Sequence, residues 1–220
     1  MIQTWIADIS PLYDEKFYRA VYETLPDFRQ KKADKTAFQK NKAQSAGAWA
    51  LLMKIREEYN ISESAAFNIS HSGDYVICSA DTGRGDASVG CDLEQIKDIN
   101  LKVAKRFFCP SESECILSQP DDQGRQEMFC RFWVLKESFM KATRRGMALD
   151  MQSFEIKPGE PPVLVKKPEE FADEYYYREY TVPGILYRMA VCSTDGDIDS
   201  KIHMELINYF SKEEYGKKNE

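Results

Sequence analysis

Apolar positions recur along the chain with two different periods, and the changes between them predict the secondary structure. From about residue 40 to 59, and again from about residue 126 to 143, apolar residues recur every three to four positions, as in a helix with one buried face. Shorter helices are expected at residues 10–25, 101–109 and 112–118. Runs typical of strands lie at residues 1–9, 66–70, 75–80, 88–93, 154–157, 163–166, 175–182 and 187–192. The sequence therefore predicts both helices and strands.

Two short stretches of the chain resemble each other and lie at corresponding places in this pattern. Residues 76–81 read VICSAD and residues 190–195 read AVCSTD, and a long predicted helix precedes the strand in both cases. A match over six residues can arise by chance, so duplication and coincidence are both open. The pattern as a whole favours an α+β fold of two similar halves over a doubly wound sheet.

Composition limits the class of protein. The 220 residues, 43% of them hydrophobic, can bury an ordinary core as one large domain or two small ones. The first 30 residues lack the basic start and apolar run of a secretory signal, and no stretch has the roughly 20 apolar residues of a membrane helix. The six cysteines form no CxxC pair, which favours reduced thiols over a disulfide framework or a zinc site. We expect a cytoplasmic protein with no membrane partner.

Charge points away from nucleic acid but leaves one basic segment. With a net charge of −6 and a pI of about 5.2, the protein is not expected to bind long duplex nucleic acid. Residues 29–42 nevertheless contain six Lys or Arg side chains and a single acidic one, Asp34. A solvated helix face would explain this basic run. The alternative is an anchor for a phosphate monoester, because lysines bind phosphate without strict spacing.

An acidic pair lies in the predicted strand that contains residues 89–94, VGCDLE. Side chains two positions apart on a strand point to the same face, so Asp92 and Glu94 should lie side by side. Two such carboxylates repel each other unless a proton or a cation lies between them, and their oxygens suit Mg²⁺. Exposure of both groups to water at the end of an edge strand would be the simpler explanation.

The second long helix contains residues 133–141, WVLKESFMK. Glu137 and Lys141 lie one turn apart, and they could form an ordinary surface ion pair worth a few tenths of a kcal/mol. Trp133 lies one turn earlier on the same side, where exposure to water would be unfavourable for an indole. We therefore expect another part of the protein to cover this face.

The strand at residues 67–72 ends in small polar residues and one of the two histidines, FNISHS. Such a strand end can offer hydroxyl, imidazole and backbone N–H donors to a phosphate. A structural role in the turn is the alternative for His71. His203, near the C-terminal end, is a weaker candidate for any site.

Taken together and in this order, the blocks at 67–72, 89–94 and 133–141 closely resemble the signature of the 4′-phosphopantetheinyl transferases of the surfactin-synthetase-activating type. Residues 26–47 and the K-R-F-F run at 105–108 also fit the spacing of that family. The resemblance implies a pseudodimer of two similar halves, each a long helix packed on a small antiparallel sheet, with coenzyme A bound between them. We expect the halves to comprise residues 1–98 and 99–220.

The resemblance also implies roles for residues that match the family motifs. Asp92, Glu94 and Glu137 match the three acidic positions that hold Mg²⁺, and Glu137 is also the proposed general base. The residues that match groups binding the phosphates of coenzyme A are Ser70, His71 and Lys141, with Lys31 near the 3′-phosphate. His71 and Lys141 would also stabilise the charge that develops during the reaction.

The sequence departs from the family pattern near the nucleotide. Members usually have a Gly-Lys-Pro loop shortly before the F-N-I-S-H block, and residues 59–66 are shortened here and contain neither a lysine nor a proline. Phe28 and Gln44 stand where some members place a lysine and a threonine on the 3′-phosphate. Arg29, Lys31 or Lys32 would have to compensate.

The implied activity is Mg²⁺-dependent transfer of 4′-phosphopantetheine from coenzyme A to a serine of an acyl or peptidyl carrier protein. We expect a monomer, with the carrier docked near residues 111–128. Two other functions use the same residues: a Mg²⁺-dependent nucleotide phosphodiesterase, in which water replaces the serine, and a non-catalytic coenzyme A-binding protein.

Overall fold

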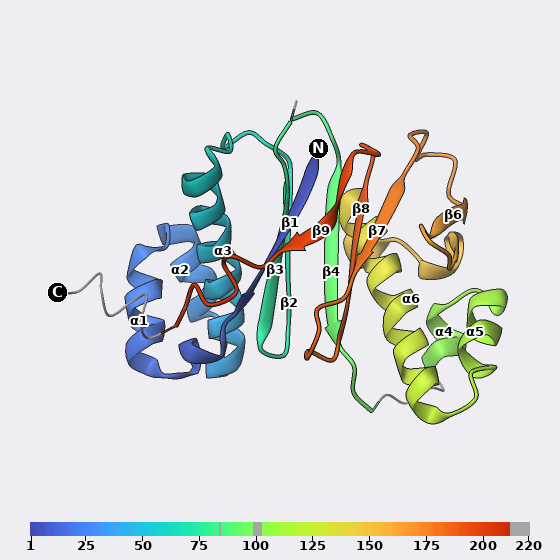
Figure 1. Ribbon diagram of the computed structural model, residues 1–220, viewed down its shortest axis with the longest axis horizontal. Helices are drawn as coiled ribbons and strands as arrows, with labels where there is room; N and C mark the ends of the chain where they lie inside the picture. Colours follow the sequence, from blue (N-terminus) through green and yellow to red (C-terminus); the bar gives the residue numbers. More distant parts are fainter. Residues whose placement is uncertain (84, 99–102, 212–220) are drawn as a thin grey trace.

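In the computed structural model, which describes residues 1–83, 85–98 and 103–211, two small sheets lie between two groups of helices (Figure 1). The first sheet has the strand order β2-β3-β1-β9 and the second the order β4-β8-β7. A separate hairpin consists of β5 and β6. Their bounds are β1 Ile2–Asp8, β2 Phe67–Ser72, β3 Tyr75–Asp81, β4 Val89–Gln95, β5 Glu155–Lys157, β6 Val163–Lys166, β7 Tyr176–Tyr180, β8 Tyr187–Ser193 and β9 Ile198–His203.

One long helix covers the outer face of each sheet. α3 packs on the first sheet and α6 on the second, and the shorter helices lie beside them (Figure 1). The helices are α1 Glu15–Thr24, α2 Asp27–Asp34, α3 Gln39–Tyr59, α4 Ala104–Phe107, α5 Pro110–Leu117 and α6 Asp122–Ala142, with short 3-10 turns at Ser10–Tyr13, Gly146–Ala148 and Met151–Ser153. Among the described residues, no helix combines the length and the apolar character needed to span a bilayer.

Alternation of apolar residues along the strands explains the layers. On β1, Trp5 faces the cluster beneath α3, whereas Ile6 faces the second sheet and packs in one cluster with Leu93 and Met189. The second helix buries its own cluster, which includes Phe139 and Phe154. The two sheets therefore share an apolar layer, which fixes one half against the other.

The two halves repeat the same order of elements. A strand, a helix of 21 residues and a hairpin occur as β1, α3, β2, β3 and again as β4, α6, β7, β8. The matching sequences at 76–81 and 190–195 belong to β3 and β8, which are each the strand between two antiparallel neighbours. The predicted α+β pseudodimer of two similar halves, each a helix on a small sheet, is confirmed, and the sheets are antiparallel except where β9 joins β1.

The division of the chain into halves at residue 98 stays a prediction. Two pairs of strands join residues from opposite sides of that division. β4 precedes that residue, yet it pairs with β8. β9 comes from the C-terminal part of the chain and pairs in parallel with β1. The chain therefore crosses between the two sheets twice.

Several boundaries differ from those predicted. α6 begins four residues earlier than expected because the Asp121 side chain caps it by accepting the Gly124 N–H at 2.7 Å. β9 was not predicted as a strand, since only two apolar residues, Ile198 and Ile202, mark it. Residues 101 and 102 of the helix expected at 101–109 lie outside the described residues.

Candidate functional site

The two halves meet where β2 runs beside β4. Ser70 Oγ donates to Asp92 Oδ1 at 2.7 Å, and Ser72 Oγ donates to Glu94 Oε2 at 2.7 Å. Alternate side chains of each strand point to one face, so two serines meet two carboxylates across the junction. The expected proximity of Asp92 and Glu94 is confirmed, and Asp92 is buried, not exposed at an edge.

Lys141 reaches this junction from α6, which packs closely against β4 at Gly90. A Cβ atom at Gly90 would lie 2.1 Å from the carbonyl oxygen of Ser138, so a larger residue would separate helix and strand. From this position Lys141 Nζ donates to Asp92 Oδ1 at 2.6 Å, to Ser70 Oγ at 2.9 Å and to the carbonyl oxygen of Cys91 at 3.1 Å. The ion pair of Lys141 is thus made with Asp92 of the neighbouring strand rather than along its own helix.

The junction concentrates negative charge around one ammonium group. Burial raises the pKa of Glu137, and the charges of Asp92 and Glu94 raise it further. Burial and then the charge of Asp92 also raise the pKa of Glu94, whose hydrogen bond from Ser72 acts in the opposite sense. For Lys141, burial would lower the pKa, but Asp92 and its hydrogen bond outweigh this effect and raise it.

The oxygen atoms of the junction fit a hard divalent cation. Asp92 Oδ2 is buried and, among the described residues, has no hydrogen-bond partner. After burial, the charge of Asp92 further disfavours the ionised forms of Glu94 and Glu137, and a cation would relieve this repulsion. As placed here, no group of three or more His, Cys, Asp or Glu within the described ranges could hold a metal ion. Mg²⁺ commonly uses one or two carboxylates together with substrate phosphates and waters, so these residues still fit it.

His71 connects the junction to the basic run. Its side chain is on the exposed side of β2, where desolvation and the charges of Lys141 and Lys32 lower its pKa. At the following turn, Gln44 Nε2 donates to the carbonyl oxygen of Gly73 at 3.0 Å, and Lys40 pairs with Asp74 at 3.1 Å. The turn after β2 is thus fastened to α3, while Lys32 of α2 lies near the histidine.

The predicted basic residues have different environments. Lys31 and Lys32 are both exposed on α2. Arg29 is buried, donates to the carbonyl oxygen of Ser45 at 3.3 Å, and lies 4.4 Å from the ring centroid of Trp49. Because the Arg29 guanidinium already contacts Ser45 and Trp49 inside the protein, Lys31 and Lys32 are the better candidates for binding a phosphate.

Trp133 is covered as expected. Its ring lies 5.5 Å from that of Phe107 and 5.8 Å from that of Phe129, both centroid to centroid. α4 therefore supplies part of the cover, and the K-R-F-F run contributes through Phe107 and through Phe108, whose ring lies 6.4 Å from Trp133.

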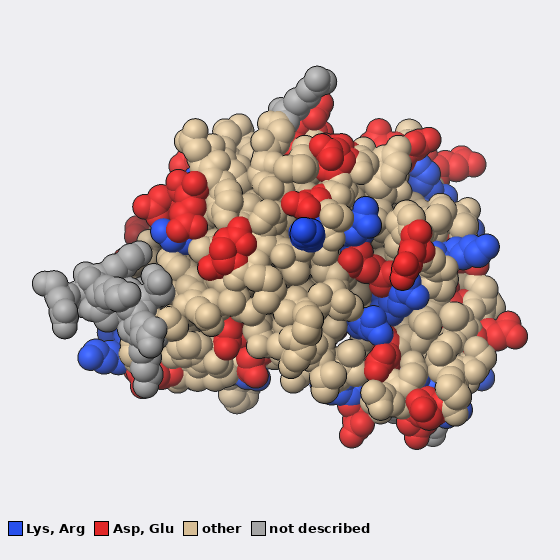
Figure 2. All heavy atoms as spheres, viewed as in Figure 1, with Lys and Arg blue, Asp and Glu red and all other residues tan. Residues whose placement is uncertain are grey.

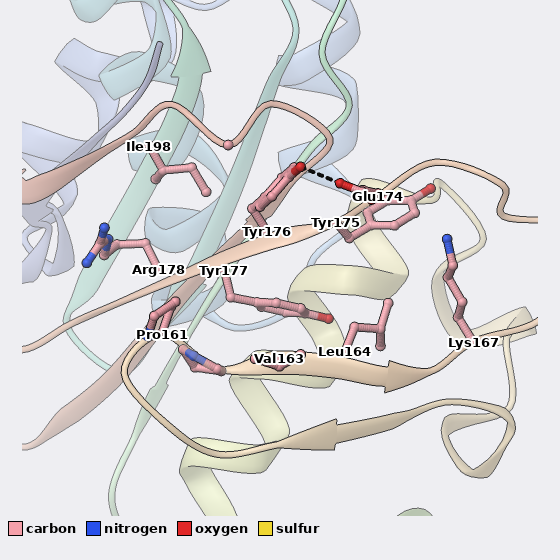
Figure 3. A pocket seen from close by; sticks show the side chains of 12 residues that line it. Pro161, Val163, Leu164, Lys167, Glu174, Tyr175, Tyr176, Tyr177, Arg178 and Ile198 are labelled. Atoms are coloured by element: carbon pink, nitrogen blue, oxygen red, sulfur yellow. Dashed lines mark hydrogen bonds between the residues drawn. The ribbon is translucent and has the colours of Figure 1, made fainter.

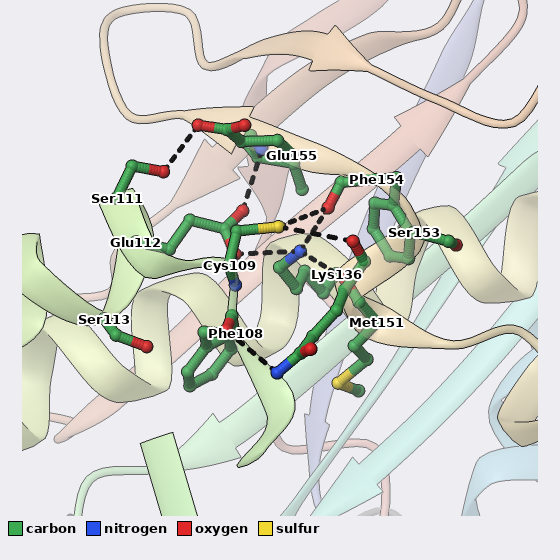
Figure 4. Close-up of polar contacts among 12 residues, drawn as sticks. Phe108, Cys109, Ser111, Glu112, Ser113, Lys136, Met151, Ser153, Phe154 and Glu155 are labelled. Carbon is green, nitrogen blue, oxygen red and sulfur yellow. Dashed lines mark hydrogen bonds and ion pairs between the residues drawn. The ribbon is translucent and has the colours of Figure 1, made fainter. Parts of the chain in front are cut away.

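A buried ion pair next to Glu137 was not assigned a role from the sequence (Figure 4). Lys136 Nζ lies 2.9 Å from Glu112 Oε2 and donates to the carbonyl oxygens of Met151 and Phe154, each at 2.7 Å. Both charged side chains are almost fully buried, at 0% and 1% exposure. Their network joins α5, α6 and the turn at residues 151–154. In the sequence, the only indication of this network is a charged residue, Lys136, among the apolar residues of the helix.

Other hollows lie apart from this junction. One, of about 470 Å³, lies between β6 and β7 and is lined by Val163, Leu164 and Tyr177 among others, none of them a predicted site residue (Figure 3). On the face drawn in Figure 2, basic side chains stand among acidic ones. The site is therefore defined by converging side chains and not by this hollow.

Comparison with known proteins confirms the resemblance. Residues 88–192, which include four of the predicted site residues, match the model of the 4′-phosphopantetheinyl transferase superfamily. The chain is 36% identical to 4′-phosphopantetheinyl transferase Sfp of Bacillus subtilis (strain 168) over 64% of this chain and 60% of that protein. It is 38% identical to 4′-phosphopantetheinyl transferase HetI of Nostoc sp. over 46% of this chain and 43% of that protein.

These relatives are longer than the part that is matched. The chain spans about 60% of the length of the curated relatives Sfp and ffp of Bacillus subtilis. A solved structure of Thermotoga maritima holo-[acyl-carrier-protein] synthase covers 48% of this chain and 61% of its own, with 21% identity and a TM-score of 0.39.

Proposed function

We propose that this protein transfers the 4′-phosphopantetheine arm of coenzyme A to a serine hydroxyl of an acyl or peptidyl carrier protein and releases 3′,5′-ADP. The observation that supports this most directly is the convergence of Asp92, Glu94, Glu137 and Lys141 with Ser70 at the junction of the two halves. These groups combine cation ligands, phosphate donors and a base in one place, which phosphoryl transfer requires.

In the proposed reaction the serine oxygen bonds to the β-phosphorus while the bond to the leaving 3′,5′-ADP breaks. The serine proton passes to Glu137, directly or through a water, and the raised pKa of this carboxylate makes it a stronger base. Lys141 and His71 donate to the diphosphate oxygens as negative charge moves onto the leaving group. Ser70 adds a hydroxyl donor beside Lys141.

One or two of the carboxylates Asp92, Glu94 and Glu137 would hold Mg²⁺ together with the diphosphate. The ion would neutralise charge on the phosphates during attack. Binding it would also relieve the repulsion that raises the pKa of Glu94 and Glu137 in its absence.

The proposed partner is a carrier protein docked beside α5 and the start of α6, within residues 111–128. We further propose that the enzyme acts as a monomer in the cytoplasm. Lys31 near the 3′-phosphate completes the coenzyme A site in this proposal.

Mass spectrometry of an apo carrier protein incubated with the enzyme, coenzyme A and Mg²⁺ tests the function. The carrier should gain about 340 Da, the mass of one phosphopantetheine arm, and only with a divalent metal. Release of 3′,5′-ADP without a carrier would instead show a phosphodiesterase. Binding of coenzyme A with no transfer to any of several carriers would show a non-catalytic binding protein, and full transfer in excess chelator would contradict the role of Mg²⁺.

A further inference from the structure

An exposed aromatic ring lies on the same face of α2 as the two candidate phosphate lysines. Phe28 is 59% exposed, and Lys31 and Lys32 follow it by three and four residues, the spacing that places side chains on one face of a helix. Four residues of helix rise by about 6 Å, which is similar to the distance between the base and the 3′-phosphate of one nucleotide. α2 thus presents an aromatic group and a basic group one turn apart.

Phe28, Trp49 and Phe67 form a row of three aromatic rings in contact, called here the aromatic row. The ring of Phe28 meets Trp49 nearly at right angles, at 86° and 5.3 Å between centroids, and Trp49 in turn lies 5.9 Å from Phe67. Arg29 lies over Trp49, and Arg56 lies over Phe67 at 4.9 Å. These contacts hold the row in place while the ring of Phe28 stays largely in solvent.

The row runs along the strand that leads to the junction. Phe67 and His71 are four residues apart on β2, so their side chains share one face of that strand. At one end of this face Phe67 joins the aromatic row, and at the other His71 lies near Lys32 and Lys141. This face of β2 therefore has aromatic side chains at one end and, at the other, a histidine near two lysines.

We infer that Phe28 is a stacking platform for the adenine ring of coenzyme A, so that α2 binds the base through Phe28 and the 3′-phosphate through Lys31 and Lys32. This inference rests on the proposed function, because the ligand it assigns is that enzyme's substrate. Bases stack readily on aromatic side chains, and Phe28 is exposed to receive one. Phe28 then contributes aromatic contact at a position where some relatives place a lysine.

Isothermal titration of the full chain with coenzyme A and with 3′-dephospho-coenzyme A tests the platform. Phe28→Ala should weaken both ligands by the same factor, about 10-fold, because both contain adenine. Lys31→Ala with Lys32→Ala should weaken only coenzyme A, and less so at high salt, because only that ligand has the 3′-phosphate. Phe38→Ala is the matched control, since Phe38 is also an exposed phenylalanine, at 73%, and should change neither affinity.

The outcomes distinguish failure of the stacking platform from failure of the proposed function. Equal affinities for Phe28→Ala and Phe38→Ala, or a loss confined to coenzyme A, would overturn the platform while leaving the proposed function intact. If the unchanged protein bound neither ligand, the proposed function itself would fail. Melting curves of the variants separate a loss of stacking from a loss of fold. Phe28→Leu is a second variant, of similar apolar volume but without an aromatic ring. Phe28→Tyr keeps the ring and should keep the affinity.

Discussion

Replacing Lys141 by methionine should destabilise the protein far more than the loss of an ordinary surface ion pair would. Asp92 is 4% exposed, and Lys141 Nζ is its only cationic partner among the described residues, at 2.6 Å. Methionine keeps the length and apolar stem of the side chain but leaves the carboxylate without a counter-charge. The sequence alone suggested a helix pair with Glu137 and hence almost no effect on stability, and the contact with Asp92 changes that expectation.

The size of the effect follows from the burial of the pair. Removing one partner of a fully buried ion pair costs about 3–5 kcal/mol. The Lys141 side chain is 24% exposed, so water can partly solvate Asp92 after the change, and we expect a loss of about 2–3 kcal/mol. An amide at position 92 needs no counter-charge, so Asp92→Asn combined with Lys141→Met should recover most of the loss.

Urea unfolding of the two single variants and the double variant measures this coupling directly. Lys54→Met is the control, because Lys54 pairs with Glu58 along its own helix at 2.9 Å and should lose only a few tenths of a kcal/mol. Equal losses for Lys54→Met and Lys141→Met, or strictly additive losses in the double variant, would refute the reasoning. Turnover of Lys141→Met should also fall by a factor on the order of 10².

Three further predictions concern the surroundings of this pair. Glu137→Gln should abolish transfer yet raise the free energy of unfolding at neutral pH, because the amide needs no ionisation in this buried place. Because folding raises the pKa of Glu137, the native protein loses stability as pH rises past its ordinary value of 4.5, so this gain should vanish in urea titrations below that pH. Lys136→Met should cost about 3–5 kcal/mol in urea unfolding by leaving the buried Glu112 carboxylate without a counter-charge, and a loss no larger than that of Lys54→Met would contradict this. Gly90→Ala should lower the melting temperature and turnover together, since its Cβ would lie 2.1 Å from the Ser138 carbonyl oxygen, and retention of both would contradict the close packing of α6 on β4.

Patterns local to the sequence were enough to predict the long helices, most strands and the candidate residues. Apolar spacing marked α3 and α6, and the alternation of side chains on a strand placed Asp92 beside Glu94. The roles of these residues came from resemblance to a family, because a pair of acidic residues alone has many explanations. Helix starts were less well predicted, since the cap at Asp121 depends on a single side chain.

Contacts between distant segments were decided only by the tertiary structure. The partner of Lys141 could not be read from the sequence, because a glutamate one turn away and an aspartate 49 residues away are equally plausible until α6 is packed against β4. The burial of Lys136 with Glu112 and the crossing of β9 to the first sheet depend likewise on which surfaces meet. Local periodicity determines which face of an element is apolar, whereas the choice of partner for that face depends on the packing of the whole chain.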